Sequence, residues 1–138
     1  MNIYLAARYS RYPEMQGYAK DLEAMGHVVT SRWILGDHEV RADGKAETDA
    51  WAPRWAQEDW EDLQCADCVI SFTEAPGDVP GRARGGRHVE FGAALALEKQ
   101  VVVIGTRENV FHWLPQVIFF PAWEDYLSVW GLISGIGR

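Results

Sequence analysis

The sequence lacks the features that define several classes of protein. No apolar run approaches the roughly 18 residues that a membrane-spanning helix requires, so no membrane partner is expected. The first residues show neither the basic start nor the long apolar stretch of a signal peptide, which makes the cytoplasm the default location. Positive charge is also scarce, because 13 Lys and Arg stand against 20 Asp and Glu. A polymeric nucleic acid is excluded as partner, since its binding depends on Lys and Arg.

Several catalytic and nucleotide-binding motifs are missing as well. The dinucleotide fingerprint G-x-G-x-x-G should follow the first predicted strand, but the loop there contains no glycine. The phosphate-binding motif G-x-x-x-x-G-K-[ST] and the nucleophile elbow G-x-S-x-G are absent too. Oxidoreductase, NTPase and serine hydrolase functions therefore lose their main support.

Cysteine occurs only twice, as Cys65 and Cys68 in one C-x-x-C motif. A redox pair opens a helix whose N-terminus lowers the thiol pKa, whereas this pair closes a helical stretch and opens a strand. A zinc site needs two further ligands at matching spacing, and the four histidines are scattered along the chain. We interpret both cysteines as buried reduced thiols and expect no metal site.

What is present suits one folded domain spanning residues 1–138. The chain has a mass of 15.6 kDa, with 48% hydrophobic and 24% charged residues. A chain of this length buries about two-thirds of the surface that it exposes when unfolded, which is enough for a single hydrophobic core. No linker, repeat or low-complexity segment divides it.

Short apolar runs alternate with helical patterns along the whole chain. The predicted strands are 3–7, 27–33, 68–72, 101–104 and 117–120. The predicted helices are 14–25, 52–66, 87–98 and 122–134, with Pro53 in the first turn of the second and a surface loop over 36–50. This alternation predicts an α/β fold: a doubly wound five-stranded parallel sheet with helices on both faces, Rossmann-like or flavodoxin-like.

Ligands of such sheets bind beyond the carboxyl ends of the strands, which directs attention to the loops 8–13, 73–86 and 105–113. Glu90 lies one turn into the helix that the second loop enters. The helix dipole and nearby arginines favour its ionised form, so it is a candidate nucleophile. The alternative is an ordinary first-turn acid that complements the dipole.

A second candidate acid lies in the helix predicted over 52–66. Asp59 belongs to an acidic run that, taken alone, is typical of a solvated face. It also shares a helical face with Trp55 and Leu63, so that face points inward. Partial desolvation there would raise the pKa of Asp59, as a general acid requires.

Four stretches of the chain, taken together, resemble a known family. They are 3–7, Asp59 eight residues before Asp67, 85–94 and 109–113. In this order and spacing the chain resembles the nucleoside 2-deoxyribosyltransferases, together with their relatives that hydrolyse the N-glycosidic bond of deoxynucleoside monophosphates. The resemblance covers nearly the whole chain in the order of its elements.

The resemblance implies roles for three residues. Glu90 takes the place of the nucleophile, which attacks C1′ of deoxyribose and forms a covalent glycosyl-enzyme. Tyr4 matches a strand tyrosine that orients this glutamate, the alternative being a core aromatic. Asp59 matches the acid that protonates the departing base. Double displacement at a sugar carbon needs such a carboxylate and such a proton donor.

The resemblance also implies a set of substrate-binding residues: Arg8, Tyr9, Arg84, Gly86, Arg87 and Asn109. Tyr9 falls where the family places an aromatic against the base, or it is a surface aromatic. Asn109 matches an asparagine that reaches the sugar 5′-hydroxyl in a neighbouring subunit's site, or it caps a loop. The glycine pair before Arg87 lets the backbone approach a ligand closely.

Arg84 departs from the family pattern. Six residues before the nucleophile the transferases carry an acid that holds the sugar hydroxyl, and the monophosphate hydrolases carry a serine near the phosphate. A cation there, with Arg82 and Arg87, suits a 5′-phosphate, although a solvated loop or a subunit contact explains it equally well. Arg84 favours a nucleotide substrate and Asn109 a nucleoside, so this choice stays open.

The resemblance thus implies an enzyme of nucleotide salvage that cleaves the N-glycosidic bond of 2′-deoxynucleosides through a glutamyl-deoxyribose intermediate. The sugar passes to another nucleobase or to water. One alternative is a 2′-deoxynucleoside 5′-monophosphate N-hydrolase, and another is a nucleotide-sensing module without catalysis. No metal or organic cofactor is implied, because a proton activates the leaving base. The implied partners are a small deoxynucleoside or deoxynucleotide and further copies of the chain, in a homo-oligomer with shared sites.

Overall fold

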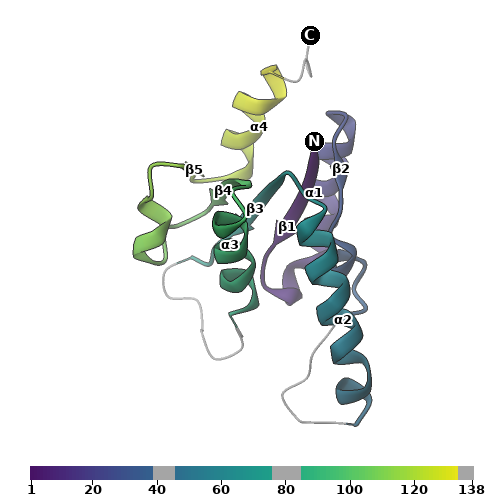
Figure 1. Cartoon of the computed structure of the whole chain (residues 1–138). Helices are drawn as coiled ribbons and strands as arrows, with labels where there is room; N and C mark the ends of the chain where they lie inside the picture. Colours follow the sequence, from purple (N-terminus) through teal and green to yellow (C-terminus); the bar gives the residue numbers. More distant parts are fainter. Residues whose placement is uncertain (39–45, 76–84, 134–138) are drawn as a thin grey trace.

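The computed structural model describes residues 1–38, 46–75 and 85–133 and contains one parallel sheet. Its strands are β1 (Asn2–Ala6), β2 (Val28–Val29), β3 (Cys68–Phe72), β4 (Gln100–Ile104) and β5 (Val117–Phe120). They lie in the order β2-β1-β3-β4-β5, and all four pairings are parallel (Figure 1). The predicted five-stranded doubly wound sheet is confirmed.

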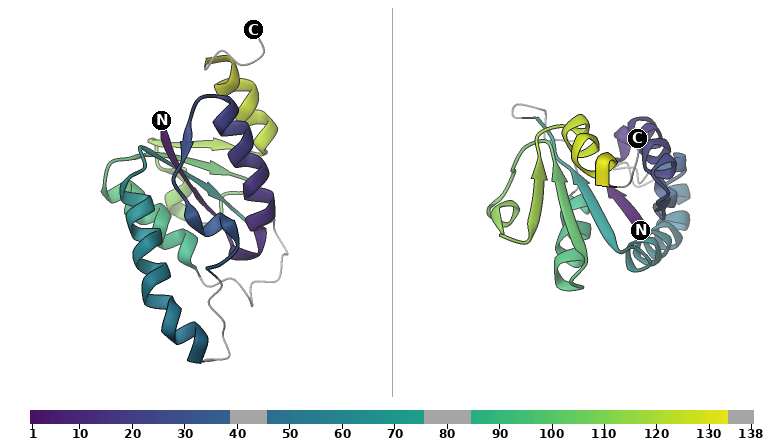
Figure 2. Two further views of the ribbon diagram at one scale, coloured as in Figure 1. Left: turned by 90° about the vertical axis from the view of Figure 1, so that its right-hand side faces the viewer. Right: turned by 90° about the horizontal axis from the view of Figure 1, so that it is seen from above.

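Helices cover both faces of this sheet. They are α1 (Tyr12–Ala24), α2 (Ala46–Gln64), α3 (Gly86–Ala96) and α4 (Trp123–Ile133). Figure 2 shows α1 and α4 on one face and α2 and α3 on the other. On the first face Tyr18 of α1 stacks on Trp123 of α4, with ring centroids 4.5 Å apart. Among the described helices, none is long and apolar enough to cross a membrane.

The core lies on the inner strands. All five residues of β3 are buried, as are four of the five residues of β1. Such continuous burial is typical of parallel strands that are covered on both faces. Because side chains alternate along a strand, Leu5 and its neighbour in register, Ile70, point to the face of α1 and α4, whereas Tyr4 points to the face of α2 and α3.

The second strand is much shorter than predicted. Only Val28–Val29 pair with β1, and a 3-10 helix η2 (Arg32–Leu35) occupies the rest of the predicted segment 27–33. Side chains make the hydrogen bonds that a longer β2 would have made to β1. The hydroxyl of Ser31 accepts from the N–H of Leu5 at 3.1 Å, and the indole N–H of Trp33 donates to the carbonyl of Leu5 at 2.7 Å. The backbone N–H and carbonyl of Leu5 are therefore satisfied without a longer partner strand.

The helix α2 begins six residues before the predicted start at residue 52. Residues 46–50 are helical, so the prediction of a loop over 36–50 is wrong there, and Pro53 lies inside the helix rather than in its first turn. These residues are polar, but they are mostly good helix formers, and Trp51 stacks on Trp55 with centroids 6.4 Å apart. The other three helices begin and end within two residues of their predicted bounds.

The two cysteines differ in their environment. Both are free thiols, but only Cys68 is buried, whereas Cys65 follows the end of α2 and is exposed. The prediction of two buried thiols is therefore wrong for Cys65. Burial in β3 raises the pKa of the Cys68 thiol to about 12.

Gly36 occupies a position that other residues fit badly. It ends η2 with φ 94°, in the left-handed region, and an added Cβ would lie 2.8 Å from Cε2 of Tyr12. We expect Gly36→Ala to lower the free energy of unfolding by about 1–3 kcal/mol, measured by urea denaturation. Gly17→Ala, where an added Cβ meets nothing within 4 Å on α1, is the control. Gly17→Ala should raise the free energy of unfolding. Equal denaturation midpoints for Gly36→Ala and the wild type would show that the turn is unstrained.

Candidate active site

The sheet has its topological switch point at β1. Its neighbour β2 lies on one side and β3 on the other, so the segments that follow β1 and β3 leave the sheet in opposite directions. Ligands of open α/β sheets bind at such a switch point, beyond the carboxyl ends of the strands. The helix α3 follows β3 in the chain and lies beside this edge of the sheet (Figure 1).

Tyr4 and Glu90 meet at this place. Tyr4 of β1 is fully buried, and its hydroxyl donates a hydrogen bond to Oε2 of Glu90 on α3. The residues are 86 positions apart in the chain, so the pairing depends on the tertiary fold. The structure thus brings together the two side chains that the family resemblance pairs.

The electrostatics of Glu90 differ from the sequence-based expectation. Burial raises its pKa to about 8, the hydrogen bond from Tyr4 lowers it, and the charge of Asp59 raises it again. The prediction that arginines and the helix dipole keep Glu90 ionised is wrong for the ligand-free protein. Desolvation outweighs the dipole, and Arg87 is bound to another carboxylate, as described below.

Asp59 has the properties expected of a proton donor. On α2 it lies between the half-buried Trp55 and the buried Leu63 on one helical face. Burial is the main cause that raises the pKa of Asp59, to about 6. The charge of His38 lowers this pKa, and the neighbouring carboxylates raise it by a smaller amount. The predicted direction is confirmed. Within the described part of the chain its buried Oδ1 has no hydrogen-bond partner.

His38 lies beside this acid, although no sequence motif indicated it. Its side chain is only 4% exposed, with Nε2 3.0 Å from Oε2 of Glu58 and 3.7 Å from Oδ1 of Asp59. The prediction treated the histidines as scattered and placed His38 in a loop. Only the turn at Gly36 and the long helix α2 bring it to Asp59, so the sequence held no local signal for it.

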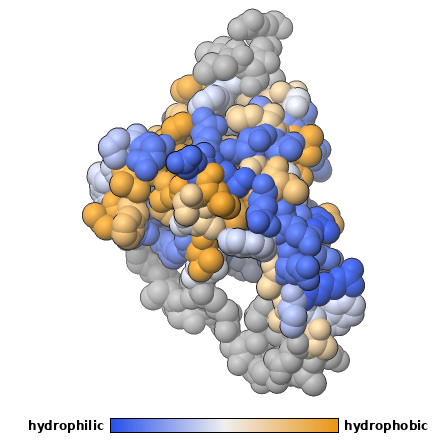
Figure 3. All heavy atoms as spheres, in the orientation of Figure 1, coloured by the Kyte–Doolittle hydropathy of each residue, from blue (hydrophilic) through white to orange (hydrophobic). Residues whose placement is uncertain are grey.

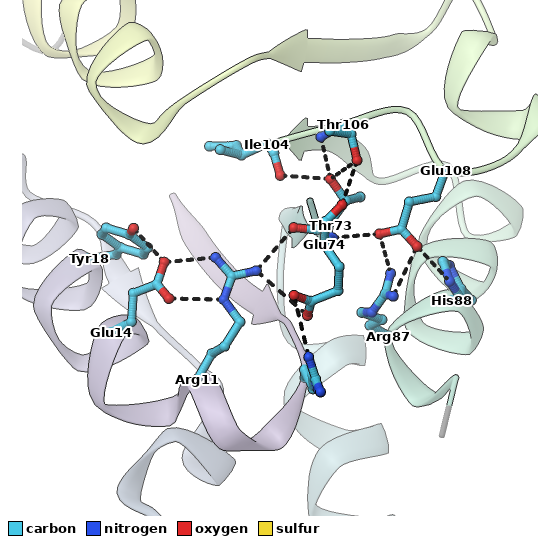
Figure 4. A network of polar contacts seen from close by, with 11 residues as sticks. Arg11, Glu14, Tyr18, Thr73, Glu74, Arg87, His88, Ile104, Thr106 and Glu108 are labelled. Atoms are coloured by element: carbon cyan, nitrogen blue, oxygen red, sulfur yellow. Dashed lines mark hydrogen bonds and ion pairs between the residues drawn. The ribbon is translucent and has the colours of Figure 1, made fainter. Parts of the chain in front are cut away.

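A network of arginines and carboxylates lies at the same edge of the sheet (Figure 4). Nη1 of Arg8 is 3.6 Å from Glu74, and Nη1 of Arg11 is 3.9 Å from the same carboxylate. Arg11 also donates two hydrogen bonds to Glu14, of 2.9 and 2.7 Å. Arg8 was predicted to bind substrate, whereas Arg11 and Glu74 were not foreseen.

Arg87 forms a second pair in this network. Its side chain is 7% exposed and donates two hydrogen bonds to Glu108, of 2.8 and 2.9 Å. Glu108 also accepts from the backbone N–H of Glu74, which links the two parts of the network (Figure 4). The predicted substrate-binding charge of Arg87 is therefore engaged by a carboxylate within the chain.

The remaining predicted residues have different surroundings. Oδ1 of Asn109 accepts from the N–H of Phe111 at 3.0 Å and caps the 3-10 helix η4 (Val110–Trp113), which is the loop-cap alternative. Tyr9 lies 6.3 Å from Trp33, measured between ring centroids. Gly86 begins α3 and is exposed, and an added Cβ would meet nothing within 4 Å. Arg82 and Arg84 lie outside the described residues.

These groups allow acid–base and nucleophilic chemistry. Two carboxyl groups with raised pKa values lie close enough for the charge of one to act on the other, and one of them is oriented by a tyrosine. Such pairs perform displacement at a sugar carbon. Among the residues that the structure describes, no three His, Cys, Asp or Glu side chains gather in a way that could hold a metal ion.

Comparison with known proteins gives structural neighbours. The chain is similar to the 2-deoxyribosyltransferase of Bacillus psychrosaccharolyticus, with 23% identity, a TM-score of 0.64, and coverage of 91% of this chain and 90% of that one. It is also similar to the CMP N-glycosidase BcmB of Clostridium botulinum, with 19% identity, a TM-score of 0.60, and coverage of 96% and 99%. No family model matches the sequence, and no curated protein matches it. At these identities the likeness shows a common fold.

Proposed function

We propose that the protein cleaves the N-glycosidic bond of a 2′-deoxynucleoside, with Glu90 as nucleophile and Asp59 as proton donor. The observation that carries this proposal is the partly buried hydrogen bond from Tyr4 to Glu90 at the switch point of the sheet. An acid with a purely structural role has no need of a fully buried tyrosine that orients it. The fold common to a deoxyribosyltransferase and an N-glycosidase agrees with it.

The reaction proceeds by two displacements. In the first, a carboxylate oxygen of Glu90 bonds to C1′, and the electron pair of the breaking C1′–N bond stays on the base, which takes the proton of Asp59. In the second, an acceptor attacks C1′ and gives its proton to Asp59, and Glu90 leaves as a carboxylate. Tyr4 holds Oε2 of Glu90, which fixes the direction of the attacking group.

The active form therefore carries one proton on the pair of Asp59 and Glu90. With pKa values of about 6 and about 8, both carboxyls are protonated at low pH, so no nucleophile is present, and both are ionised at high pH, so no acid is present. We expect kcat/KM of the wild type to be bell-shaped between these values, which belong to the pair. A kcat/KM that stays constant from pH 5 to 9 would contradict this assignment.

The acceptor separates transferase from hydrolase. We propose another nucleobase as acceptor, and a 2′-deoxynucleoside 5′-monophosphate N-hydrolase as the second candidate. The test is incubation with a deoxynucleoside plus a free base and, separately, with a deoxynucleoside monophosphate. A new nucleoside identifies a transferase, and free sugar phosphate identifies a hydrolase. A panel that yields no product, together with calorimetric binding of a deoxynucleotide, would instead identify a sensing module.

The arginine network bears on the same choice. Arg8, Arg11 and Arg87 each already face a carboxylate, so a phosphate would have to compete with Glu74 or Glu108 for them. A neutral 5′-hydroxyl meets no such competition. Among the described residues this pairing favours a nucleoside over its monophosphate.

We also propose that the chain forms a homo-oligomer, as the family resemblance implies. Apolar surface gathers over α3 and η4 (Figure 3), and its exposed members include Val89, Val110, Phe111 and Trp113. Exposed patches of this kind mark interaction sites. Light scattering should give a mass above one chain, and Val110→Asp, which places a charge in the patch, should lower it. A wild-type mass of one chain at micromolar concentration would contradict the proposal.

A further inference from the structure

His38 lies between Asp37, its neighbour in the chain, and Glu58 of α2. Its side chain is 4% exposed, and its ring is 5.9 Å from that of Trp55, measured between centroids. Nδ1 is 2.7 Å from Oδ1 of Asp37, and Nε2 is 3.0 Å from Oε2 of Glu58. Carboxylate oxygens only accept hydrogen bonds, and a neutral imidazole donates from one nitrogen only. A ring with a carboxylate at each nitrogen therefore fits the doubly protonated, positively charged imidazolium.

This charge reaches Asp59. Nε2 of His38 lies 3.7 Å from Oδ1 of Asp59, too far for a hydrogen bond and close enough for an ion pair. Oδ1 is the buried atom that has no hydrogen-bond partner within the described part of the chain. Among the described residues, the charge of His38 thus compensates a carboxylate at this atom.

Other charged groups also act on Asp59, and they come from every element around it. They are Glu58 and Asp62 of α2, Arg32 of η2, Tyr4 of β1 and Glu90 of α3. The acids favour the neutral form of Asp59, and the cation Arg32 opposes them. Arg32, however, is bound to Asp62 at 2.9 Å, so much of its charge is already compensated. Among the described residues, His38 is therefore the cation that acts most directly on Asp59.

We propose that His38 is a positioning residue that decides which carboxyl of the pair holds the single proton. Its imidazolium keeps Asp59 ionised in the ligand-free protein and leaves the proton on Glu90, so that the nucleophile is neutral at rest. This inference rests on the proposed function for its catalytic meaning, although the control of Asp59 by His38 is measurable without any reaction.

Substrate binding then places the single proton on Asp59 instead of Glu90. A nucleobase placed against Asp59 removes water from it and offers a nitrogen that accepts a hydrogen bond, and both effects favour the protonated acid. One proton leaves the carboxyl of Glu90 and one arrives at Asp59 by exchange with solvent, so the total is unchanged. The nucleophile becomes charged only when a base is present to leave, which protects the resting carboxylate from other electrophiles.

The first measurement is the NMR titration of the Asp59 carboxyl carbon in aspartate-labelled protein. His38→Gln keeps an N–H donor for Glu58 and removes the positive charge, so Asp59 should titrate at higher pH than in the wild type. Glu58→Gln should move the titration in the opposite direction, because it removes an anion beside Asp59 and leaves the imidazolium less compensated. His27→Gln, near Met1 at the opposite end of β1, is the control and should change nothing.

The two outcomes are distinct. Shifts of opposite sign in the two variants support the proposal, since a merely structural role would not reverse with the sign of the charge. An unchanged Asp59 titration in His38→Gln, or shifts of the same sign in both variants, would overturn it. If His38→Gln fails to fold, His38→Asn, which also removes the positive charge, takes its place in the same titration. In an active enzyme the acid limb of kcat/KM should follow the same shifts, whereas a wild type inactive on all substrates would refute the proposed function and leave the NMR result valid.

Discussion

Glu90→Gln is expected to lower kcat/KM by about 10⁴-fold or more on whichever substrate the enzyme turns over. The amide keeps an oxygen that accepts the hydrogen bond from Tyr4, so the local geometry is preserved. It cannot form the bond to C1′, because an amide is a far weaker nucleophile than a carboxylate. The measurement is product formation by chromatography at enzyme concentrations high enough to detect the residual rate.

The control for this variant is Glu98→Gln, which changes an exposed acid just beyond the end of α3 and should retain the full rate. Thermal unfolding of Glu90→Gln should show a folded protein, since the substitution replaces a partly buried acid by a neutral group of the same shape. A folded Glu90→Gln variant with more than a tenth of the wild-type activity would show that another residue carries the reaction.

Asp59→Asn should lower kcat/KM by about 10²- to 10⁴-fold on a substrate whose base leaves only when protonated. On a deoxyriboside whose leaving group departs as a stable anion, the loss should be much smaller, because no proton is needed. The comparison of kcat/KM on the two substrates therefore isolates proton donation from a general disturbance of the site.

The pH dependence gives a second test of Asp59→Asn. On the substrate whose base leaves only when protonated, the residual kcat/KM of this variant should lack the basic limb and keep rising with pH until Glu90 is fully ionised. Asp125→Asn, an exposed acid on α4, is the control and should retain the bell-shaped profile. Equal losses on both substrates would mean that Asp59 supports the structure of the site and does not donate a proton.

The inner strands of the sheet could be predicted well from the sequence because they are buried on both faces. The run 68–72 is almost continuously apolar, with Ser71 as its polar residue, and it matches β3 residue for residue. The strand predicted over 27–33 failed for the opposite reason. It lies at the edge of the sheet, where the side chains of Ser31 and Trp33 satisfy the backbone of β1 and no regular pairing is required.

The site could be predicted only in part. Tyr4, Asp59 and Glu90 each lie in a regular element with a recognisable local pattern, and the fold brings them to one edge of the sheet. The charge pairs have no such pattern. Arg87 binds Glu108, 21 residues further along the chain, so its guanidinium could not be recognised from sequence as already engaged. His38 reaches Asp59 only through a turn and the early start of α2, which polar composition concealed.

Trapping the sugar on the protein tests the glutamyl intermediate most directly. Enzyme mixed with a deoxynucleoside that has a fast-leaving base, quenched in acid within the first turnover, would be examined by intact mass spectrometry and peptide mapping. We expect the mass of one deoxyribosyl group on the peptide that contains Glu90, and no such adduct in Glu90→Gln. Free base released in the first turnover without any adduct, or an adduct on another residue, would contradict the assignment of Glu90 as nucleophile.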